Sequence, residues 1–151
     1  MSNGSNITII GAGIGGLSAA LALSHANPKH RITVYESNSG LSEFGAGVLV
    51  SANSIRIFDA WRLYESIKKI AVEPRSLEFR RWDNNVTLFA SPHNPRSEWL
   101  YDYPRWTLYR PDLQRELYKG LDRCKNVSVL FGKKIVHVDH ATATVTMEDG
   151  S

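Results

Sequence analysis

Short β-branched runs and one longer apolar segment alternate at the start of the chain. Residues 7–10 read Ile-Thr-Ile-Ile, residues 17–26 are mostly apolar, and residues 32–35 form a second short run. Short apolar runs rich in β-branched residues are typical of strands, whereas a longer apolar segment is typical of a buried helix. The pattern therefore predicts a strand–helix–strand unit, in which the two strands lie parallel in one sheet.

The middle of the chain changes from helical to strand-like patterning. Helical spacing of apolar residues predicts one helix from about residue 53 to residue 62 and a shorter one over 64–70, which Pro74 ends. Residues 77–82 and 86–90 flank a cluster of turn-forming residues and predict a β-hairpin. Residues 91–105 contain three prolines and predict an ordered loop.

The last third of the chain returns to the first sheet. Pro111 suits the first turn of a helix that buries Leu113, Leu117 and Leu121. Residues 127–131 predict a third strand of the main sheet, and residues 135–139 and 142–147 predict two strands of a β-meander. Because residues 149–151 resemble the turn of a hairpin, we expect this hairpin and the three-stranded sheet to be incomplete in this chain.

The loop after the first strand, residues 11–16, reads Gly-Ala-Gly-Ile-Gly-Gly. Gly11 permits a tight turn, Gly13 leaves the backbone open to a diphosphate, and Gly16 lets the helix pack closely on the strand. The helix N-terminus offers unpaired N–H groups and a partial positive charge. Glu36 ends the second strand, where a carboxylate would accept hydrogen bonds from a ribose. These features predict a dinucleotide-binding unit that disfavours NADP and leaves NAD or FAD.

Composition is that of an ordinary soluble domain. The chain has 151 residues, 42% hydrophobic and 22% charged, and a net charge of +3. The basic residues form scattered doublets without interleaved aromatics, which argues against a nucleic-acid partner. No apolar run is long enough for a signal peptide or a membrane span, so we expect a cytoplasmic protein. The oligomeric state is left open.

Candidate catalytic and metal-binding residues are not evident. Cys124 is the single cysteine, cannot form an internal disulfide, and is expected to be buried. The five histidines, among them His93, follow no partner pattern and are expected at the surface. The sequence therefore predicts neither a catalytic residue nor a metal site.

Four segments together resemble the FAD-dependent aromatic-ring hydroxylases, the flavin monooxygenases typified by salicylate and 4-hydroxybenzoate hydroxylase. The segments are residues 11–16 with Glu36, residues 43–53 (Glu-Phe-Gly-Ala-Gly-Val-Leu-Val-Ser-Ala-Asn), residues 109–113 (Tyr-Arg-Pro-Asp-Leu) with Leu117, and residues 129–136. The first is shared with many flavoproteins, so the second and third carry the resemblance. Tyr109 and Pro111 depart from the His and the Ala or Ser that family members often have.

The resemblance implies roles for particular residues in binding FAD. The diphosphate and ribose would be held by Gly11, Ala12, Gly13, Ile14, Gly15, Gly16 and Glu36. The flavin side of the cofactor would be approached by Gly45, Ala46 and Gly47, the ribityl-diphosphate region by Arg110, and the adenine by Val136. The guanidinium of Arg110 is always charged and can make forked hydrogen bonds to phosphate oxygens. The family's later Asp-Gly and Gly-Asp motifs would lie beyond residue 151.

Together these features predict the α/β class, with a Rossmann-like FAD-binding βαβ sheet, a β-meander and an incomplete β-hairpin layer of a substrate domain. Residues 1–75 and 105–151 would form the incomplete FAD-binding domain, and residues 76–104 the start of the substrate domain. The resemblance implies the N-terminal part of an NAD(P)H- and O2-dependent monooxygenase that hydroxylates a small aromatic or related substrate.

Two alternatives stay open. In the first, the isolated chain would be a truncated, catalytically inactive module that binds FAD or ADP at most weakly. Single helix-terminus contacts contribute only about 0.3–1 kcal/mol, so tight binding would need further contacts around the flavin. The other alternative is a fragment of an NAD-dependent dehydrogenase, which the second glycine loop and the Arg110 segment disfavour.

Overall fold

The computed structural model of the protein describes residues 3–41 and 44–150. Its backbone divides into two compact units. Unit 1 comprises the residues up to Gly45 together with those from Leu113 onwards, and unit 2 comprises Ala46–Asp112. The domain boundaries predicted near residues 75 and 105 stay a prediction, since these backbone units do not report function.

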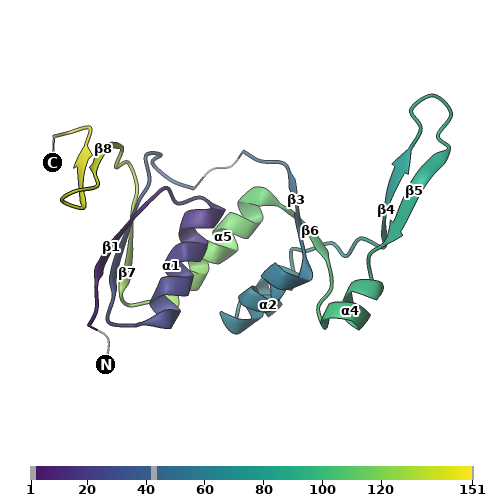
Figure 1. Cartoon of the computed structure of the whole chain (residues 1–151), viewed down its shortest axis with the longest axis horizontal. Helices are drawn as coiled ribbons and strands as arrows, with labels where there is room; N and C mark the ends of the chain where they lie inside the picture. The colour runs from purple at the N-terminus through teal and green to yellow at the C-terminus, as the bar shows by residue number, and fades with distance from the viewer. Residues whose placement is uncertain (1–2, 42–43, 151) are drawn as a thin grey trace. The chain divides into compact units, whose positions relative to one another are not determined.

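Unit 1 is built on a parallel sheet (Figure 1). Its elements are β1 (Asn6–Ile10), α1 (Ile14–Ala26), β2 (Arg31–Tyr35), α5 (Arg110–Gly120, whose first three residues belong to unit 2), the 3-10 turn η1 (Leu121–Arg123), β7 (Val127–Leu130), β8 (Ile135–Asp139) and β9 (Thr144–Met147). The strand order is β1-β2-β7, with Ile7 opposite Ile32 and Ile32 opposite Val127. The predicted strand–helix–strand unit and the return of a third strand to the sheet are confirmed.

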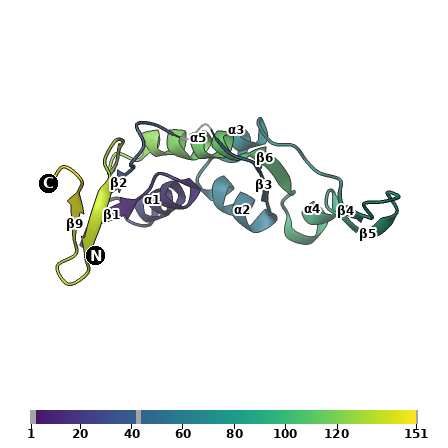
Figure 2. The ribbon, with the colours of Figure 1, turned by 90° about the horizontal axis from the view of Figure 1, so that it is seen from above.

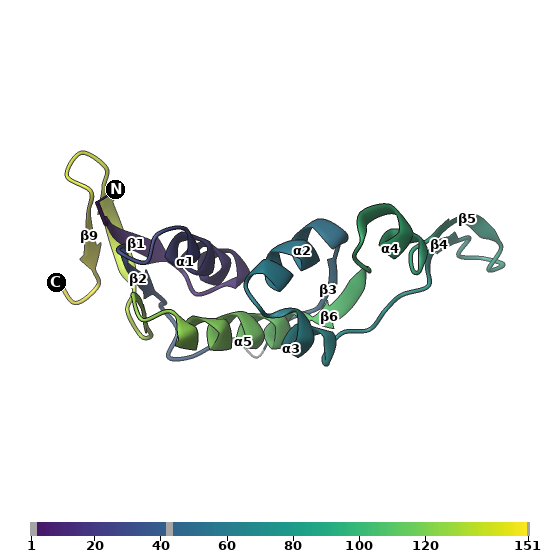
Figure 3. The same ribbon diagram turned by 90° about the horizontal axis from the view of Figure 1, so that it is seen from below.

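The core of unit 1 lies between α1, α5 and the sheet. Helix α1 buries Leu17, Ala20, Leu21 and Ser24, which is the spacing of one helical face. Strand β2 buries Ile32 and Val34, and the predicted stripe Leu113, Leu117 and Leu121 is buried as well. The antiparallel pair β8–β9 lies on the side of the sheet away from α1 (Figures 2 and 3). This side of the sheet is only partly covered, because Ile10 of β1 is 54% exposed and Leu130 of β7 is 41% exposed.

Unit 2 joins short helices to two antiparallel strand pairs. Its elements are β3 (Gly47–Val50), α2 (Ala52–Ala60), α3 (Tyr64–Lys68), β4 (Ser76–Arg80), β5 (Thr87–Pro92), α4 (Arg96–Tyr101) and β6 (Trp106–Tyr109). Strand β3 pairs with β6, and β4 pairs with β5. The core holds Ile55, Phe58, Ile67, Trp106 and Leu108, all of them buried.

The predicted loop over residues 91–105 was wrong at residues 91–92, which end β5, and at residues 96–101. Residues 96–101 form α4, and the adjoining residues 106–109 form β6, a strand that the sequence pattern did not indicate. In α4, Ser97 is buried and its hydroxyl donates to the Tyr103 carbonyl. Strand β6 is held by pairing with β3, about sixty residues earlier in the chain. Both elements depend on long-range packing, which local composition does not report.

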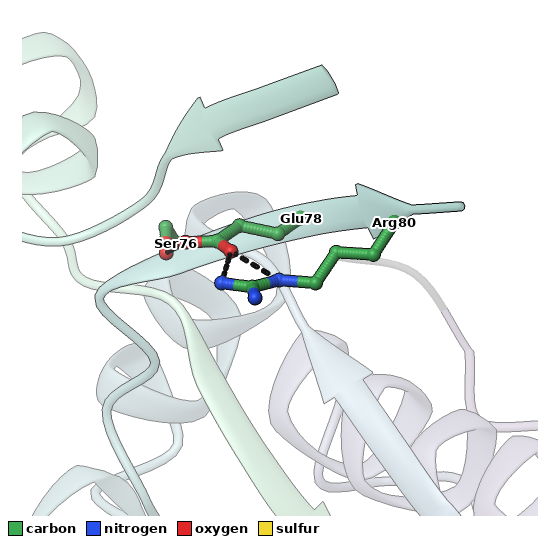
Figure 4. A network of polar contacts seen from close by, with 3 residues as sticks. All are labelled: Ser76, Glu78 and Arg80. Atoms are coloured by element: carbon green, nitrogen blue, oxygen red, sulfur yellow. Dashed lines mark hydrogen bonds and ion pairs between the residues drawn. The ribbon is translucent and has the colours of Figure 1, made fainter. Parts of the chain in front are cut away.

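The β4–β5 hairpin was predicted and is confirmed. One face of β4 carries a polar row, in which the Arg80 guanidinium donates to the Glu78 carboxylate with Nε–Oε2 of 2.9 Å (Figure 4). The Ser76 hydroxyl lies 3.4 Å from the other oxygen of Glu78. The opposite face carries Leu77 and Phe79, and the ring of Phe79 lies 5.9 Å from that of Phe89. These apolar side chains are exposed.

Two further expectations have opposite outcomes. Cys124 is buried and forms no disulfide, as predicted. The expectation that every histidine lies at the surface was wrong, because His93 is only 4% exposed. His93 directly precedes α4, the Ser97 N–H donates to its carbonyl, and its Nε2 lies 3.0 Å from Nη1 of Arg105. Among the described residues, no helix is long and apolar enough to cross a membrane.

A matched pair of glycine substitutions tests how α1 meets β1. A Cβ at Gly16 would lie 1.9 Å from the Gly11 carbonyl oxygen, whereas a Cβ at Gly15 would have no neighbour within 4 Å. We expect Gly16→Ala to lower the free energy of unfolding by about 3 kcal/mol through steric overlap. Gly15→Ala should raise it by up to about 1 kcal/mol through helix propensity. Urea unfolding followed by circular dichroism measures both, and equal stabilities would contradict the packing argument.

Candidate nucleotide-binding site

A glycine turn joins β1 to α1 at the carboxyl end of the sheet. Gly11 has φ of +95°, a left-handed conformation that favours glycine, and its N–H donates to the Tyr35 carbonyl at 2.7 Å. Gly16 packs directly against the Gly11 carbonyl, an approach that is possible only because Gly16 has no Cβ. The structural roles predicted for these two glycines are confirmed. They place the first turn of α1 against the ends of two parallel strands.

The N-terminus of α1 is open to an anion. Gly13 is the residue before the helix, and as a glycine it has no side chain with which to cap the helix. No acidic residue lies in the first turn, and a Cβ at Gly13 or Gly15 would meet nothing within 4 Å. The N–H groups of a first helical turn have no partner inside the helix and carry a partial positive charge. This end of α1 therefore has the shape and charge that a diphosphate requires.

The carboxylate of Glu36 lies beside the glycine turn, next to Ala12. Its Oε2 accepts a hydrogen bond from the Ala12 N–H at 2.9 Å. Its Oε1 accepts from the Asn38 N–H at 2.9 Å, the Asn38 side-chain amide at 2.8 Å and the Ser37 hydroxyl at 3.2 Å. The side chain that sequence spacing assigned to the ribose thus lies beside the glycine turn, with both oxygens oriented by donors.

These hydrogen bonds keep Glu36 ionised. Partial burial by itself would raise the pKa of the carboxyl group. The N–H groups of Asn38 and Ala12 and the side chains of Ser37 and Asn38 outweigh that effect, so the pKa lies below its usual 4.5. The site therefore presents a carboxylate, which attracts hydroxyl donors and repels a phosphate.

Gln114 binds the backbone carbonyl of Ala12, a role that the sequence analysis did not predict. Its Nε2 donates to the Ala12 carbonyl at 2.7 Å, although the two residues are 102 positions apart. Gln114 is 6% exposed, and its Oε1 is buried without a partner among the described residues. The only signal in the sequence was a polar residue beside Leu113, on the predicted buried stripe. Gln114 and Glu36 therefore fix the Ala12 backbone at both its N–H and its C=O.

A second turn closes the end of the sheet beside Glu36. Gly132, with φ of +67°, donates its N–H to the Asn38 carbonyl, and the Lys133 N–H donates to the Glu36 carbonyl, both at 2.8 Å. The Glu36 N–H in turn donates to the Leu130 carbonyl at 2.9 Å. The backbone that carries the Glu36 side chain is thus fixed by the loop after β7. Val136, predicted to lie near adenine, follows on β8 and is 54% exposed.

The other predicted cofactor residues divide between the units. Gly45 is exposed in unit 1, whereas Ala46, Gly47 and Arg110 belong to unit 2. There the Arg110 N–H donates to the Ala46 carbonyl at 3.1 Å, so these two predicted residues are brought together. Their cofactor contacts stay a prediction. Glu43, at the start of the second family-like segment, lies outside the described residues.

Comparison with known proteins agrees with this geometry. Residues 9–48 match the family described as an NAD(P)-binding Rossmann-like domain. An FAD-dependent monooxygenase of Arthrinium sp is 29% identical over 96% of this chain and 32% of its own length. The 3-amino-4-hydroxybenzoate 2-monooxygenase of Streptomyces cremeus is 32% identical over 72% of this chain and 27% of its own.

Over most of its length this chain is similar to FAD-dependent monooxygenases and to hydroxylases of aromatic acids, among them a 3-hydroxybenzoate 6-hydroxylase. It spans about a third of the length of the curated relatives it matches. A solved 2-methyl-3-hydroxypyridine-5-carboxylic acid oxygenase shares the fold, with a TM-score of 0.81 at 19% identity over 99% of this chain and 37% of its own. The predicted resemblance and the α/β Rossmann-like fold of this monooxygenase family are confirmed.

The lowered pKa of Glu36 predicts an acid dependence of stability. A carboxyl group whose pKa is lower in the folded state stabilises the fold fully above its unfolded pKa, near 4.5, and loses this contribution as the pH falls through the folded pKa. Replacing it by Glu36→Gln should cost about 1 kcal/mol at pH 7. We expect that difference to shrink below pH 4.5. Urea unfolding across a pH series measures it, and a constant difference down to low pH would contradict the assignment.

Proposed function

We propose that this chain forms the FAD-binding part of a flavin monooxygenase that uses NAD(P)H and O2 to hydroxylate an aromatic or related small molecule. The observation that carries the proposal is the joint placement of the open α1 N-terminus and the Glu36 carboxylate around Ala12. The first suits a diphosphate and the second suits a ribose. Bound FAD would supply the oxygen chemistry, and the protein supplies placement and electrostatics.

Each part of the glycine turn has a role in this proposal. The backbone from Gly11 to Gly16, including Ala12, Ile14 and Gly15, would lie against the diphosphate. Glu36 would accept hydrogen bonds from the adenosine ribose, and Val136 would lie near the adenine. Ala46, Gly47 and Arg110 would serve the flavin side. Repulsion between the Glu36 carboxylate and a 2′-phosphate disfavours NADP as the ligand of this turn.

The substrate class comes from the names of relatives, and NAD(P)H as electron donor comes from the family resemblance alone. Two relatives carry hydroxybenzoate compounds in their names, 3-amino-4-hydroxybenzoate 2-monooxygenase and 3-hydroxybenzoate 6-hydroxylase 1. We extend this to an aromatic substrate here, with NAD(P)H as the reductant. We place the protein in the cytoplasm. The 151-residue chain by itself should bind FAD without catalysing NAD(P)H oxidation.

Titration of the purified chain with FAD tests the proposal. Quenching of flavin fluorescence and the visible absorbance spectrum report binding, and NAD and NADP serve as competing ligands. We expect FAD to bind and Glu36→Gln to weaken binding roughly tenfold or more, because a charge-assisted hydrogen bond is lost. Glu65→Gln, an equal change of charge on α3 in unit 2, is the matched control and should bind FAD like the unaltered chain.

Other outcomes would redirect the assignment. Binding of NAD in preference to FAD would support the dehydrogenase alternative. Equal affinities in Glu36→Gln and Glu65→Gln would remove Glu36 from the site. NAD(P)H oxidation by the isolated chain with bound FAD would contradict the expectation that it is catalytically inactive.

Gln114 should act on FAD affinity through the glycine turn. Gln114→Leu removes the amide that holds the Ala12 carbonyl, which leaves the backbone N–H groups of the turn less well oriented for a diphosphate. We expect this variant to bind both FAD and ADP more weakly. Gln114→Asn keeps an amide on a shorter side chain, and it should restore affinity in part only if that amide reaches the Ala12 carbonyl. Calorimetric titration with FAD, ADP and adenosine separates the effects. A loss that is equal for adenosine, which has no diphosphate, would contradict an action through the turn.

A further inference from the structure

The segment from His93 to Arg105 forms a loop in unit 2 that carries α4 and is closed at its base. Asn94 and Arg105 join the two ends of the loop. The Asn94 side-chain amide donates to the Arg105 carbonyl, and the Arg105 N–H donates to the Asn94 side-chain oxygen, both at 2.8 Å. Inside the loop, the Ser97 N–H donates to the His93 carbonyl and the Ser97 hydroxyl donates to the Tyr103 carbonyl. The position of α4 therefore depends on this base.

The imidazole of His93 makes a further contact at the base of the loop. Its Nε2 lies 3.0 Å from Nη1 of Arg105. A guanidinium only donates hydrogen bonds, so Nε2 accepts and the ring proton resides on Nδ1. The His93 side chain is buried, and its Nδ1 has no partner among the described residues. The closed loop therefore requires a neutral ring, because a second proton would have to occupy the Nε2 position that faces Arg105.

The charged groups around His93 provide no carboxylate for a protonated ring. The neighbouring segments carry Arg56 and Asp59 on α2, Arg75 before β4, Glu78 and Arg80 on β4, Arg96 and Glu98 on α4, Asp102 after α4, and Arg105. Within the described part of the chain, none of these carboxylates forms a hydrogen bond or ion pair with the imidazole. Burial first, and then the charge of Arg105, lower the pKa of His93 below its usual 6.5.

We infer that the loop from His93 to Arg105 is a pH-sensitive switch, which is closed while His93 is neutral and opens when His93 takes up a proton. A proton on Nε2 removes the acceptor for the guanidinium and brings two like charges to hydrogen-bond distance in a buried place. Opening moves both groups into water and releases α4. The switch lies in unit 2 and does not depend on the proposed binding of FAD.

The direction of the pH dependence follows from the lowered pKa of His93. Below the unfolded value, near 6.5, the open loop binds a proton that the closed loop does not bind. The stability of the closed loop is therefore fully present above that value and is lost as the pH falls through the lower pKa of the closed form. The Glu36 carboxyl group titrates in a separate range, below 4.5.

Amide hydrogen exchange of the 151-residue chain, resolved by NMR at about pH 7.5 and about pH 5, tests the inference. After correction for the intrinsic pH dependence of exchange, we expect the Ser97 and Arg105 amides to lose protection about tenfold or more at the lower pH. His93→Gln has no titrating ring and should show equal protection at both pH values. His140→Gln removes an exposed histidine of unit 1 and should leave the loss of protection unchanged.

Three results would overturn the inference. They are unchanged protection of Ser97 and Arg105 between the two pH values, an equal loss at the Ile32 amide of β2 in unit 1, and the same pH dependence in His93→Gln. If His93→Gln does not fold, the unaltered chain decides. The imidazole resonances of His93 should then titrate with the same midpoint as the loss of protection at Ser97, and separate midpoints would refute the switch.

Discussion

The proposed nucleotide site of this protein depends on the close approach of α1 to the turn at Gly11. That approach exists only because Gly16 has no side chain, since a Cβ would lie 1.9 Å from the Gly11 carbonyl oxygen. It sets the helix N-terminus at the ends of β1 and β2. The backbone of Ala12 is then held at both polar groups, its N–H by Glu36 and its C=O by Gln114. A rigid turn of this kind pays little ordering cost when a diphosphate binds.

The electrostatics of the turn separate two parts of a nucleotide. The free N–H groups at the start of α1 favour negative charge, while the ionised Glu36 favours hydroxyl donors. Hydrogen bonds from the loop after β7 hold the Glu36 backbone, and the donors on Ala12, Ser37 and Asn38 orient its carboxylate. This division of charge is the physical basis for the FAD proposal and for the proposal that a 2′-phosphate is disfavoured. The similarity of the chain to FAD-dependent monooxygenases agrees with it.

Sequence patterns predicted the elements whose signals are local. The strands and the helix around the glycine turn follow from periodicity and composition over a few residues, and so does the β4–β5 hairpin around its turn residues. The roles of Gly11 and Gly16 could be predicted because each needs a backbone conformation or an approach that only glycine allows. The position of Glu36 beside the turn could be predicted as well, because β2 runs parallel to β1 and both strands end at the same edge of the sheet.

Amino-acid sequence by itself thus determined the class of fold, the glycine turn and the acidic residue beside it. Tertiary structure alone decided the rest. Strand β6 exists because β3 pairs with it, His93 is buried next to Arg105 where α4 begins, and Gln114 reaches Ala12 from 102 positions away. Local patterns report local conformational preference, whereas these features arise from contacts whose free energy appears only when distant segments pack together.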